Sequence, residues 1–167
     1  MLGRRPALYV NARAIIERGQ GPEREVLLQL RARRGEPRTL ELPGGQVDPF
    51  EGIVQALCRE VQEETGLTVS TFLDELNEVR GEGADTAVEC LTPSFVYQTL
   101  RGPVDSVGFF FRVEAQGELT RRGDDAEGHE WITLPELRQR SRQHPETFNW
   151  LTRGVLPFYL RAVDARA

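Results

Sequence analysis

The sequence has few cysteines, no long apolar run and no hydrophobic leader, and each absence excludes a class of protein. Its two cysteines, Cys58 and Cys90, are too few for a disulfide framework and lack metal-ligand spacing. We therefore expect two buried, reduced thiols. No stretch reaches the roughly 18 consecutive apolar residues needed to cross a membrane, and Asn11 and Arg13 interrupt the aliphatic segment 7–16 that a signal peptide would need. These absences predict a cytoplasmic protein.

The chain also lacks an excess of positive charge. Its net charge is −5 and its pI is about 5.2, which argues against a dedicated DNA- or RNA-binding protein. A small anionic substrate stays compatible with this balance, because local arginines or a bound metal override the global charge. The 167 residues, 39% hydrophobic and 28% charged, are typical of one soluble globular domain spanning residues 1–167.

Apolar runs separated by glycine and proline predict an alternation of strands and helices. Several strand pairs have hairpin-length connections, which favours an α/β sandwich with a mixed sheet over a doubly wound parallel sheet. Residues 80–85, with two glycines, are expected to form a loop. Strands are expected at 7–17, 25–32, 39–42, 68–76, 94–100, 107–113 and 130–133, and helices at 52–65, 134–140 and 145–161.

The helix expected at 52–65 has recognisable ends. Its start is indicated by Asp48 before a proline and Glu51 three positions later, the pattern of a capping box. Its end is indicated by Gly66, the usual residue after a helix C-terminus. Four apolar residues share one face and predict the side that packs on the sheet: Ile53, Ala56, Leu57 and Val61.

Three glutamates lie on one side of this helix. Glu60, Glu63 and Glu64 are spaced i, i+3 and i+4, so their carboxylates project together. Two charges about 4 Å apart repel by roughly 4 kcal/mol at an effective dielectric of 20. Either full solvation or a bound cation makes the cluster tolerable, and Mg²⁺ prefers such oxygen ligands. The preceding Gly44 and Gly45 let backbone groups approach a ligand closely.

These residues form a longer pattern that resembles the box of the Nudix hydrolase family at every defined position. The pattern is Gly-x5-Glu-x7-Arg-Glu-(aliphatic)-x-Glu-Glu-x-Gly-(aliphatic). The matching residues are Gly45, Glu51, Arg59, Glu60, Val61, Glu63, Glu64, Gly66 and Leu67.

The resemblance implies a Nudix-type α/β/α sandwich with a mixed β-sheet and a site for divalent metal. It implies that Glu60, Glu63 and Glu64 bind the metal, with Glu64 the most essential ligand, and that the carbonyl of Gly44 completes the set. Arg59 would hold the glutamates in place. Glu51 would support the junction of loop and helix. Mg²⁺ is the expected cofactor, and Mn²⁺ stays open because both accept carboxylate oxygen.

Family members often use another acid from a later loop as a metal ligand or general base. Here that loop is the acidic segment 123–131, in which Glu127 is the first choice and Asp125 and Glu130 follow. A solvated acidic turn is the competing interpretation. The expected reaction is attack on phosphorus by a metal-activated water, with Glu60 or an acid of the late loop taking the proton.

The box fixes phosphoanhydride chemistry but not the leaving group. We expect a (deoxy)nucleoside triphosphate or related nucleoside-diphosphate derivative, because marks of the ADP-ribose, dinucleoside polyphosphate and coenzyme A subgroups are imperfect. ADP-ribose, nucleotide-sugar or coenzyme A hydrolysis, RNA 5′-end processing and a non-catalytic nucleotide-binding module stay open, as does a homodimer. The residues expected to contact substrate are Arg31, Arg33, Gly45 and Tyr97.

Overall fold

A computed structural model describes residues 7–31, 35, 37–120 and 126–165 of the chain. Its strands are β1 (Tyr9–Arg18), β2 (Glu25–Arg31), β3 (Thr39–Glu41), β4 (Gly44–Gln46), β5 (Thr68–Phe72), β6 (Val79–Glu82), β7 (Ala87–Cys90), β8 (Phe95–Gln98), β9 (Ser106–Gln116) and β10 (Ala126–Thr133). Its helices are α1 (Ile53–Thr65), α2 (Leu134–Gln143) and α3 (Trp150–Asp164), with short 3₁₀ turns η1 (Gly21–Glu23) and η2 (Pro145–Thr147).

Eight strands form a mixed sheet built around β1. The main order is β10-β2-β1-β9-β5, while β3 pairs with β2, β4 with β1 and β8 with β9. Strands β1 and β9 are parallel from Tyr9 opposite Ser106 to Ile16 opposite Val113, and the other pairs are antiparallel. The mixed sheet that the sequence predicted is thus confirmed.

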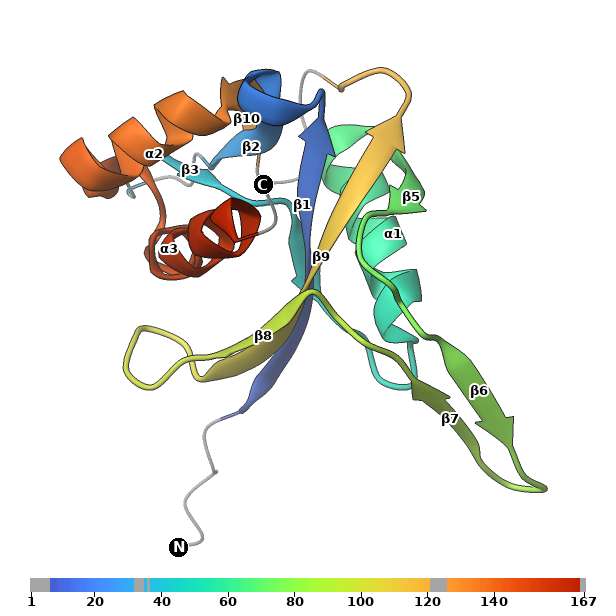
Figure 1. The fold of residues 1–167 in the computed structure, drawn as a ribbon. Helices are drawn as coiled ribbons and strands as arrows, with labels where there is room; N and C mark the ends of the chain where they lie inside the picture. Colours follow the sequence, from blue (N-terminus) through green and yellow to red (C-terminus); the bar gives the residue numbers. More distant parts are fainter. Residues whose placement is uncertain (1–6, 32–34, 36, 121–125, 166–167) are drawn as a thin grey trace, which may run out of the picture.

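Helices cover both faces of this sheet, with α1 on one side of β1 and β9 and α3 on the other (Figure 1). Alternate residues of β1 explain the layers, because successive side chains of a strand point to opposite faces. Ala12 and Ala14 pack in the core beneath α1, whereas Ile15 belongs to the core beneath α2 and α3. The α/β/α sandwich is therefore confirmed, and the small side chains of β1 let α1 lie close to the sheet.

Residues 80–85 were expected to form a loop, and that prediction was wrong for residues 80–82, which belong to strand β6, whereas residues 83–85 lie in the turn before β7. Strands β6 and β7 pair as a separate hairpin, from Val79 opposite Cys90 to Glu82 opposite Ala87, and the hairpin projects from the body of the molecule (Figure 1). Cys90, on this hairpin, is exposed, so the expectation of two buried thiols was wrong for it, while Cys58 is partly buried. Both corrections have the same cause. Most residues of β6 and β7 are exposed, so no buried apolar pattern marked the strands and the side chain of Cys90 is left at the surface.

The same hairpin caps α1. The amide of Ile53, at the first turn of the helix, donates a hydrogen bond to the carboxylate of Glu89 at 2.9 Å. The predicted start of the helix is confirmed, but the cap comes from a strand 36 residues away. Glu51 keeps part of the expected capping contact, because it accepts a hydrogen bond from the Asp48 amide at 3.0 Å.

The helix expected over residues 145–161 begins later than predicted. Residues 145–147 form the turn η2, and α3 starts only at Trp150. Asn149 is the N-cap, since its side chain accepts a hydrogen bond from the Thr152 amide at 2.8 Å. The strong capping preference of asparagine explains where the helix starts.

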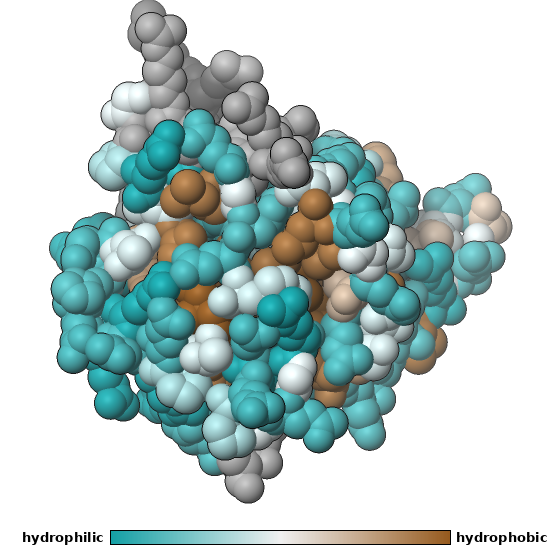
Figure 2. Space-filling model, turned by 90° about the horizontal axis from the view of Figure 1, so that it is seen from above, coloured by the Kyte–Doolittle hydropathy of each residue, from teal (hydrophilic) through white to brown (hydrophobic). Residues whose placement is uncertain are grey.

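Figure 2 shows hydrophilic side chains over most of the face seen from above, with hydrophobic residues visible in separate patches. None of the helices in the described part of the chain is long and apolar enough to pass through a membrane.

Candidate active site

The glutamates of α1 border a hollow of about 290 Å³ beside β4. Helix α1 supplies the acidic side, the β3–β4 segment supplies the backbone edge, and β1 and β2 supply two arginines. The lining residues are Asn11, Arg13, Arg31, Glu41, Gly44, Gly45, Gln46, Glu60, Glu63 and Glu64. Charges of both signs therefore meet in one partly enclosed space.

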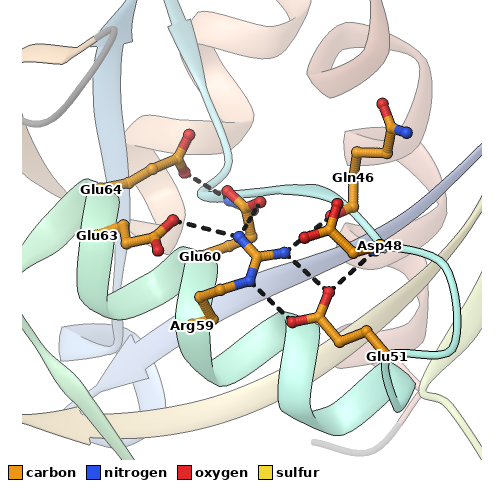
Figure 3. A network of polar contacts seen from close by, with 8 residues as sticks. Gln46, Asp48, Glu51, Arg59, Glu60, Glu63 and Glu64 are labelled. Atoms are coloured by element: carbon orange, nitrogen blue, oxygen red, sulfur yellow. Dashed lines mark hydrogen bonds and ion pairs between the residues drawn. The ribbon is translucent and has the colours of Figure 1, made fainter.

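Arg59 is the hub of the acidic side (Figure 3). Its guanidinium donates to both oxygens of Glu51, from Nε at 2.8 Å and from Nη2 at 2.9 Å. Its Nη1 donates to Glu60 at 2.7 Å and to Glu63 at 3.2 Å, and Nη2 also reaches the Gln46 carbonyl at 3.0 Å. A planar guanidinium suits such forked contacts. Arg59 thereby joins the start of α1, its glutamates and the end of β4.

Glu64 lies apart from this hub and faces the backbone of Gly44 instead. Its carboxylate accepts a hydrogen bond from the Gly44 amide at 2.7 Å. Burial raises the pKa of Glu64 to about 7, although the Gly44 hydrogen bond and the nearby Arg13 oppose the shift. The backbone carbonyl of Glu64 accepts a hydrogen bond from His129 Nε2 at 3.0 Å, which ties α1 to β10.

The two glycines of β4 stand where side chains would collide. A Cβ on Gly44, whose φ is +126°, would lie 2.4 Å from the carbonyl oxygen of Ala12. A Cβ on Gly45 would lie 2.5 Å from Oε2 of Glu60. Glycine at both positions lets the backbone approach β1 on one side and the Glu60 carboxylate on the other.

The opposite wall carries a buried carboxylate and two arginines. Glu41 is only 4% exposed and contacts Gln29 at 3.2 Å and Arg31 at 3.2 Å. Arg13 donates from Nη1 to the Leu42 carbonyl at 3.0 Å, while its buried Nε has no partner among the described residues. Two guanidinium groups therefore line the same hollow as the three glutamates of α1.

Sequence reasoning assigned no role in the site to Arg13, Glu41 or His129. A signal existed for Arg13, because a charged residue interrupts an otherwise aliphatic strand and so indicates a functional or paired position. Glu41 stands two residues before Pro43 on a three-residue strand, and His129 lies far from α1 in sequence. For these two, only the tertiary pairing of β2 with β3 and β10 reveals the contact.

The other predicted residues are dispersed. Arg31 and Gly45 line the hollow, whereas Tyr97 lines a second hollow beside α3. Glu127 forms an ion pair with Arg38 at 2.7 Å and is absent from the described lining of the glutamate hollow. Glu130 is bound to Arg140 at 2.7 Å. Arg33 and Asp125 lie outside the described residues.

The expected metal ligands are not gathered around one point. Within the described ranges, no group of three histidine, cysteine, aspartate or glutamate side chains is placed to hold a metal ion. The reason is visible at Arg59, which engages Glu60 and Glu63 while Glu64 faces the Gly44 amide. The donor chemistry nevertheless suits a hard cation, because carboxylate oxygens from one helix border a hollow that the glycine edge of β4 also lines.

The NUDIX domain model matches residues 8–153, which includes the sheet, α1, α2 and the hollow. The chain belongs to the NUDIX domain family. Pyrophosphate hydrolysis with divalent metal is the general activity of Nudix hydrolases.

A curated relative, nudix hydrolase 1 of Caenorhabditis elegans, is 40% identical over 75 residues, which is 45% of this chain. That match spans only 20% of the relative's own length.

Solved structures support the same Nudix fold. The MutT protein from Methanosarcina mazei Go1 matches with a TM-score of 0.63 and 20% identity, covering 96% of this chain and 98% of that one. The MutT NUDIX hydrolase from Burkholderia pseudomallei matches with a TM-score of 0.59 and 24% identity, covering 90% and 97%. The NUDIX domain of Shewanella oneidensis NrtR, solved with ADP ribose, matches with a TM-score of 0.56 and 17% identity, covering 80% of this chain and 77% of that one. Likeness at these identities establishes the fold.

The contact between Glu51 and Arg59 makes stability depend on pH. Hydrogen bonds from Arg59 and from the Asp48 amide lower the pKa of Glu51 from 4.5 to about 2. A lowered pKa stabilises the fold above pH 4.5, and this contribution is lost as the pH falls towards 2. We expect Glu51→Gln to destabilise the protein by about 2 kcal/mol at pH 7, with a difference that shrinks between pH 4.5 and 2.

Thermal unfolding followed by circular dichroism at pH 7, 4.5, 3 and 2 would measure this difference. Glu63→Gln is the matched control, since the Glu63 side chain is 49% exposed and contacts the same guanidinium at 3.2 Å. It should change stability little, because exposed ion pairs contribute weakly. A destabilisation by Glu51→Gln that stays constant across this pH range would contradict the assignment.

Proposed function

We propose that this Nudix chain is a divalent-metal-dependent hydrolase of phosphoanhydride bonds in nucleoside-diphosphate-linked substrates, with (deoxy)nucleoside triphosphates as the first choice. One observation carries the proposal: four glutamates and two arginines line a single hollow next to the glycine edge of β4. Acidic oxygens suit a hard cation and guanidinium groups suit phosphate oxygens. A site with only one of these charges would not bring metal and phosphate together.

Glu60, Glu63 and Glu64 would hold the cation, together with the carbonyl of Gly44. The strand register supports the use of this carbonyl. The amide of Ala14 bonds the Pro43 carbonyl, so Arg13 and Gly44, the next antiparallel pair, are of the type that exchanges no ladder hydrogen bonds. The Gly44 carbonyl is then available to a ligand. Glu60 and Glu63 would exchange part of their contact with Arg59 for the cation.

Arg59 would serve as a positioning residue. It stays bound to both oxygens of Glu51 while its Nη1 contacts Glu60 and Glu63. The Glu51 contact would keep the guanidinium fixed when the metal-binding carboxylates turn. Arg13 and Arg31 face the same hollow and would bind phosphate oxygens of the substrate.

A bound divalent cation would supply an acidic water and neutralise charge on the phosphate oxygens. The proton of the attacking water would pass to a carboxylate, for which Glu60 and the late-loop acid Glu127 are the candidates. Glu60 borders the hollow, whereas Glu127, on β10, forms an ion pair with Arg38. This placement favours Glu60 as the base, with Mg²⁺ the first cation to test and Mn²⁺ the second.

Product release from a substrate panel tests the proposal. The panel would contain nucleoside triphosphates, ADP-ribose, dinucleoside polyphosphates, nucleotide sugars, coenzyme A and 5′-triphosphorylated RNA. We expect turnover of nucleoside triphosphates that requires Mg²⁺ or Mn²⁺, disappears with EDTA and returns when metal is restored. Cleavage confined to another panel member would reassign the substrate. Binding of nucleotide and metal without any turnover would identify a binding module instead.

A further inference from the structure

The β6–β7 hairpin projects from the body of the molecule (Figure 1) and forms a two-stranded sheet of its own. All residues of β6 are exposed. The free edge of a strand presents amide and carbonyl groups that pair readily with another chain. A hairpin with only two strands also gains stability when further strands join it. The edge of β6 is therefore a surface on which a further strand can be accommodated.

The hydrogen bonds of the hairpin decide which backbone groups of β6 point outward. The Gly83 amide donates to the Thr86 carbonyl at 2.7 Å, so this pair is of the hydrogen-bonded type. In antiparallel strands, such pairs alternate with pairs that exchange no hydrogen bonds. Along the observed register, Gly81 therefore turns its amide and carbonyl towards β7, whereas Arg80 and Glu82 turn theirs away from it.

The two outward-facing residues have opposite charges, which makes the edge complementary to itself. A second copy of β6, added antiparallel, can pair these residues with one another in three registers. Pairing Arg80 with Arg80, or Glu82 with Glu82, places like charges opposite each other and is unfavourable. The third register has its twofold axis at Gly81 and places Arg80 of each copy opposite Glu82 of the other. Both of these pairs are then of the hydrogen-bonded type, so backbone and charge select the same register.

Both side chains have capacity for this contact. Glu82 forms no ion pair with another residue of the described chain. Arg80 contacts Glu78 from Nε at 3.1 Å and Glu89 from Nη2 at 3.3 Å, and its side chain stays 64% exposed. Because a guanidinium has five N–H donors, a carboxylate from a second copy can be added. The two existing contacts would hold the guanidinium near the strand.

The edge of β7 lacks this complementarity. By the same alternation, Ala87 and Glu89 turn their backbone groups outward on β7. One of these residues is neutral and the other acidic, so no register of this edge against itself pairs unlike charges. The Glu89 carboxylate is also bound to the Ile53 amide of α1, and its side chain is only 14% exposed. The edge of β6 is therefore the one that fits a second copy.

One face of the hairpin adds apolar surface to this contact. Val79, Gly81, Val88 and Cys90 share that face, because they occupy alternate positions of the two paired strands. Both valines are more than half exposed. No described atom lies within 4 Å of the position that a Cβ on Gly81 would occupy, so packing within one copy does not explain this glycine. Glycine inside a strand often marks the close approach of another backbone.

We propose that β6 of this protein pairs with β6 of a second copy, forming a four-stranded antiparallel sheet with a twofold axis at Gly81. The partner is the chain itself, and each copy contributes the same surface. Such a small contact belongs to the weak class of interfaces, and we expect a Kd on the order of 100 µM. The proposal does not depend on the chemistry of the glutamate hollow.

Charge reversal tests the register. Glu82→Arg and Arg80→Glu each place like charges opposite each other in both pairs, so each should raise the dimer Kd at least about tenfold. An equimolar mixture of the two variants restores unlike charges at both pairs and should associate with a Kd close to that of the wild type. Sedimentation equilibrium up to about 1 mM protein would measure all four samples. Thermal unfolding would check that the variants keep the fold, since these side chains are exposed.

Disulfide formation tests the position of the axis. In a Cys58→Ser/Cys90→Ser background, Gly81→Cys would face its own copy with Cα atoms about 4.5 Å apart, within the range of a disulfide. Val79→Cys is the matched control, because it lies on the same strand and face but about 13 Å from its copy in this register. We expect oxidised dimer to accumulate at least about tenfold faster for Gly81→Cys.

Three results would overturn the proposal: a wild type that stays monomeric at about 1 mM, a mixture of charge variants that associates no better than either variant alone, or equal cross-linking of Gly81→Cys and Val79→Cys. Dimerisation with restored association in the mixture and selective cross-linking of Gly81→Cys would establish the interface. None of these measurements uses a substrate, so failure of the interface would leave the proposed hydrolase untouched, and failure of the substrate panel would leave the interface untouched.

Discussion

Replacing Glu64 by glutamine is expected to lower metal-dependent turnover by about 1,000-fold, because a neutral amide cannot supply the negative charge that a divalent cation requires. A loss of several kcal/mol in metal-assisted charge stabilisation corresponds to this factor. Glutamine has nearly the same shape, and its oxygen can still accept the hydrogen bond that the Gly44 amide donates at 2.7 Å. The change therefore removes charge while keeping the packing, and steady-state kinetics at saturating Mg²⁺ would measure it.

Stability measurements separate this loss of function from a loss of folding. Burial raises the pKa of Glu64 from 4.5 to about 7. A carboxyl group with a raised pKa favours folding below pH 4.5, and that contribution is lost as the pH rises through about 7. In EDTA at pH 8, Glu64→Gln should therefore unfold at a temperature equal to or above that of the wild type. A stable variant that retains wild-type kcat would remove Glu64 from the metal site.

The parts of the fold that the sequence predicted well are those with a strong local pattern. Helix α1 begins and ends within a residue of its predicted bounds, because its apolar face recurs at helical spacing and Gly66 stops it in a left-handed conformation. The β6–β7 hairpin was not predicted. All residues of β6 are exposed, and Gly81 and Gly83 are typical of loops, so no alternation of buried and exposed positions marks the strand.

In the candidate site, too, contacts between residues close in the sequence differ from contacts between distant residues in how far they could be predicted. Contacts among Glu51, Arg59 and Glu60 arise within one loop and one helix. The resemblance to the Nudix box implied that Arg59 holds glutamates of the helix, whereas its contact with Glu51 was not predicted. Arg13 lies opposite Gly44 only because β1 pairs with β4 in this register. His129 reaches the end of α1 across 65 residues of sequence. Spacing carries no information about such distant pairs. Arg31 was among the residues expected to contact substrate, but the presence of Arg13 in the same hollow became visible only in three dimensions.

A second large effect is expected far from the glutamates, at the buried ion pair between Arg112 and Glu17. Arg112 donates to both carboxylate oxygens of Glu17, at 2.6 and 3.1 Å, and to Asp74 at 3.2 Å. Glu17 is only 3% exposed. Arg112→Met would leave the Glu17 charge in the core with Arg24, at 3.5 Å, as the remaining neighbouring cation. We expect a destabilisation of about 3–5 kcal/mol in urea unfolding at pH 7.

The double variant Glu17→Gln/Arg112→Met decides whether the destabilisation of Arg112→Met comes from the unpaired charge of Glu17 or from the lost packing of the arginine side chain. If the uncompensated carboxylate causes the loss, neutralising it should recover more than half of the lost free energy, so the two changes should be strongly non-additive. If the packing of the arginine stem dominates, the double variant should be no more stable than Arg112→Met. The first outcome follows from the physics of buried charge, because a carboxylate in the core that has lost its main cationic partner is far less favourable than a neutral amide of the same shape. It would also explain why a charged residue persists in the apolar strand β9, where the sequence pattern alone gives no reason for one.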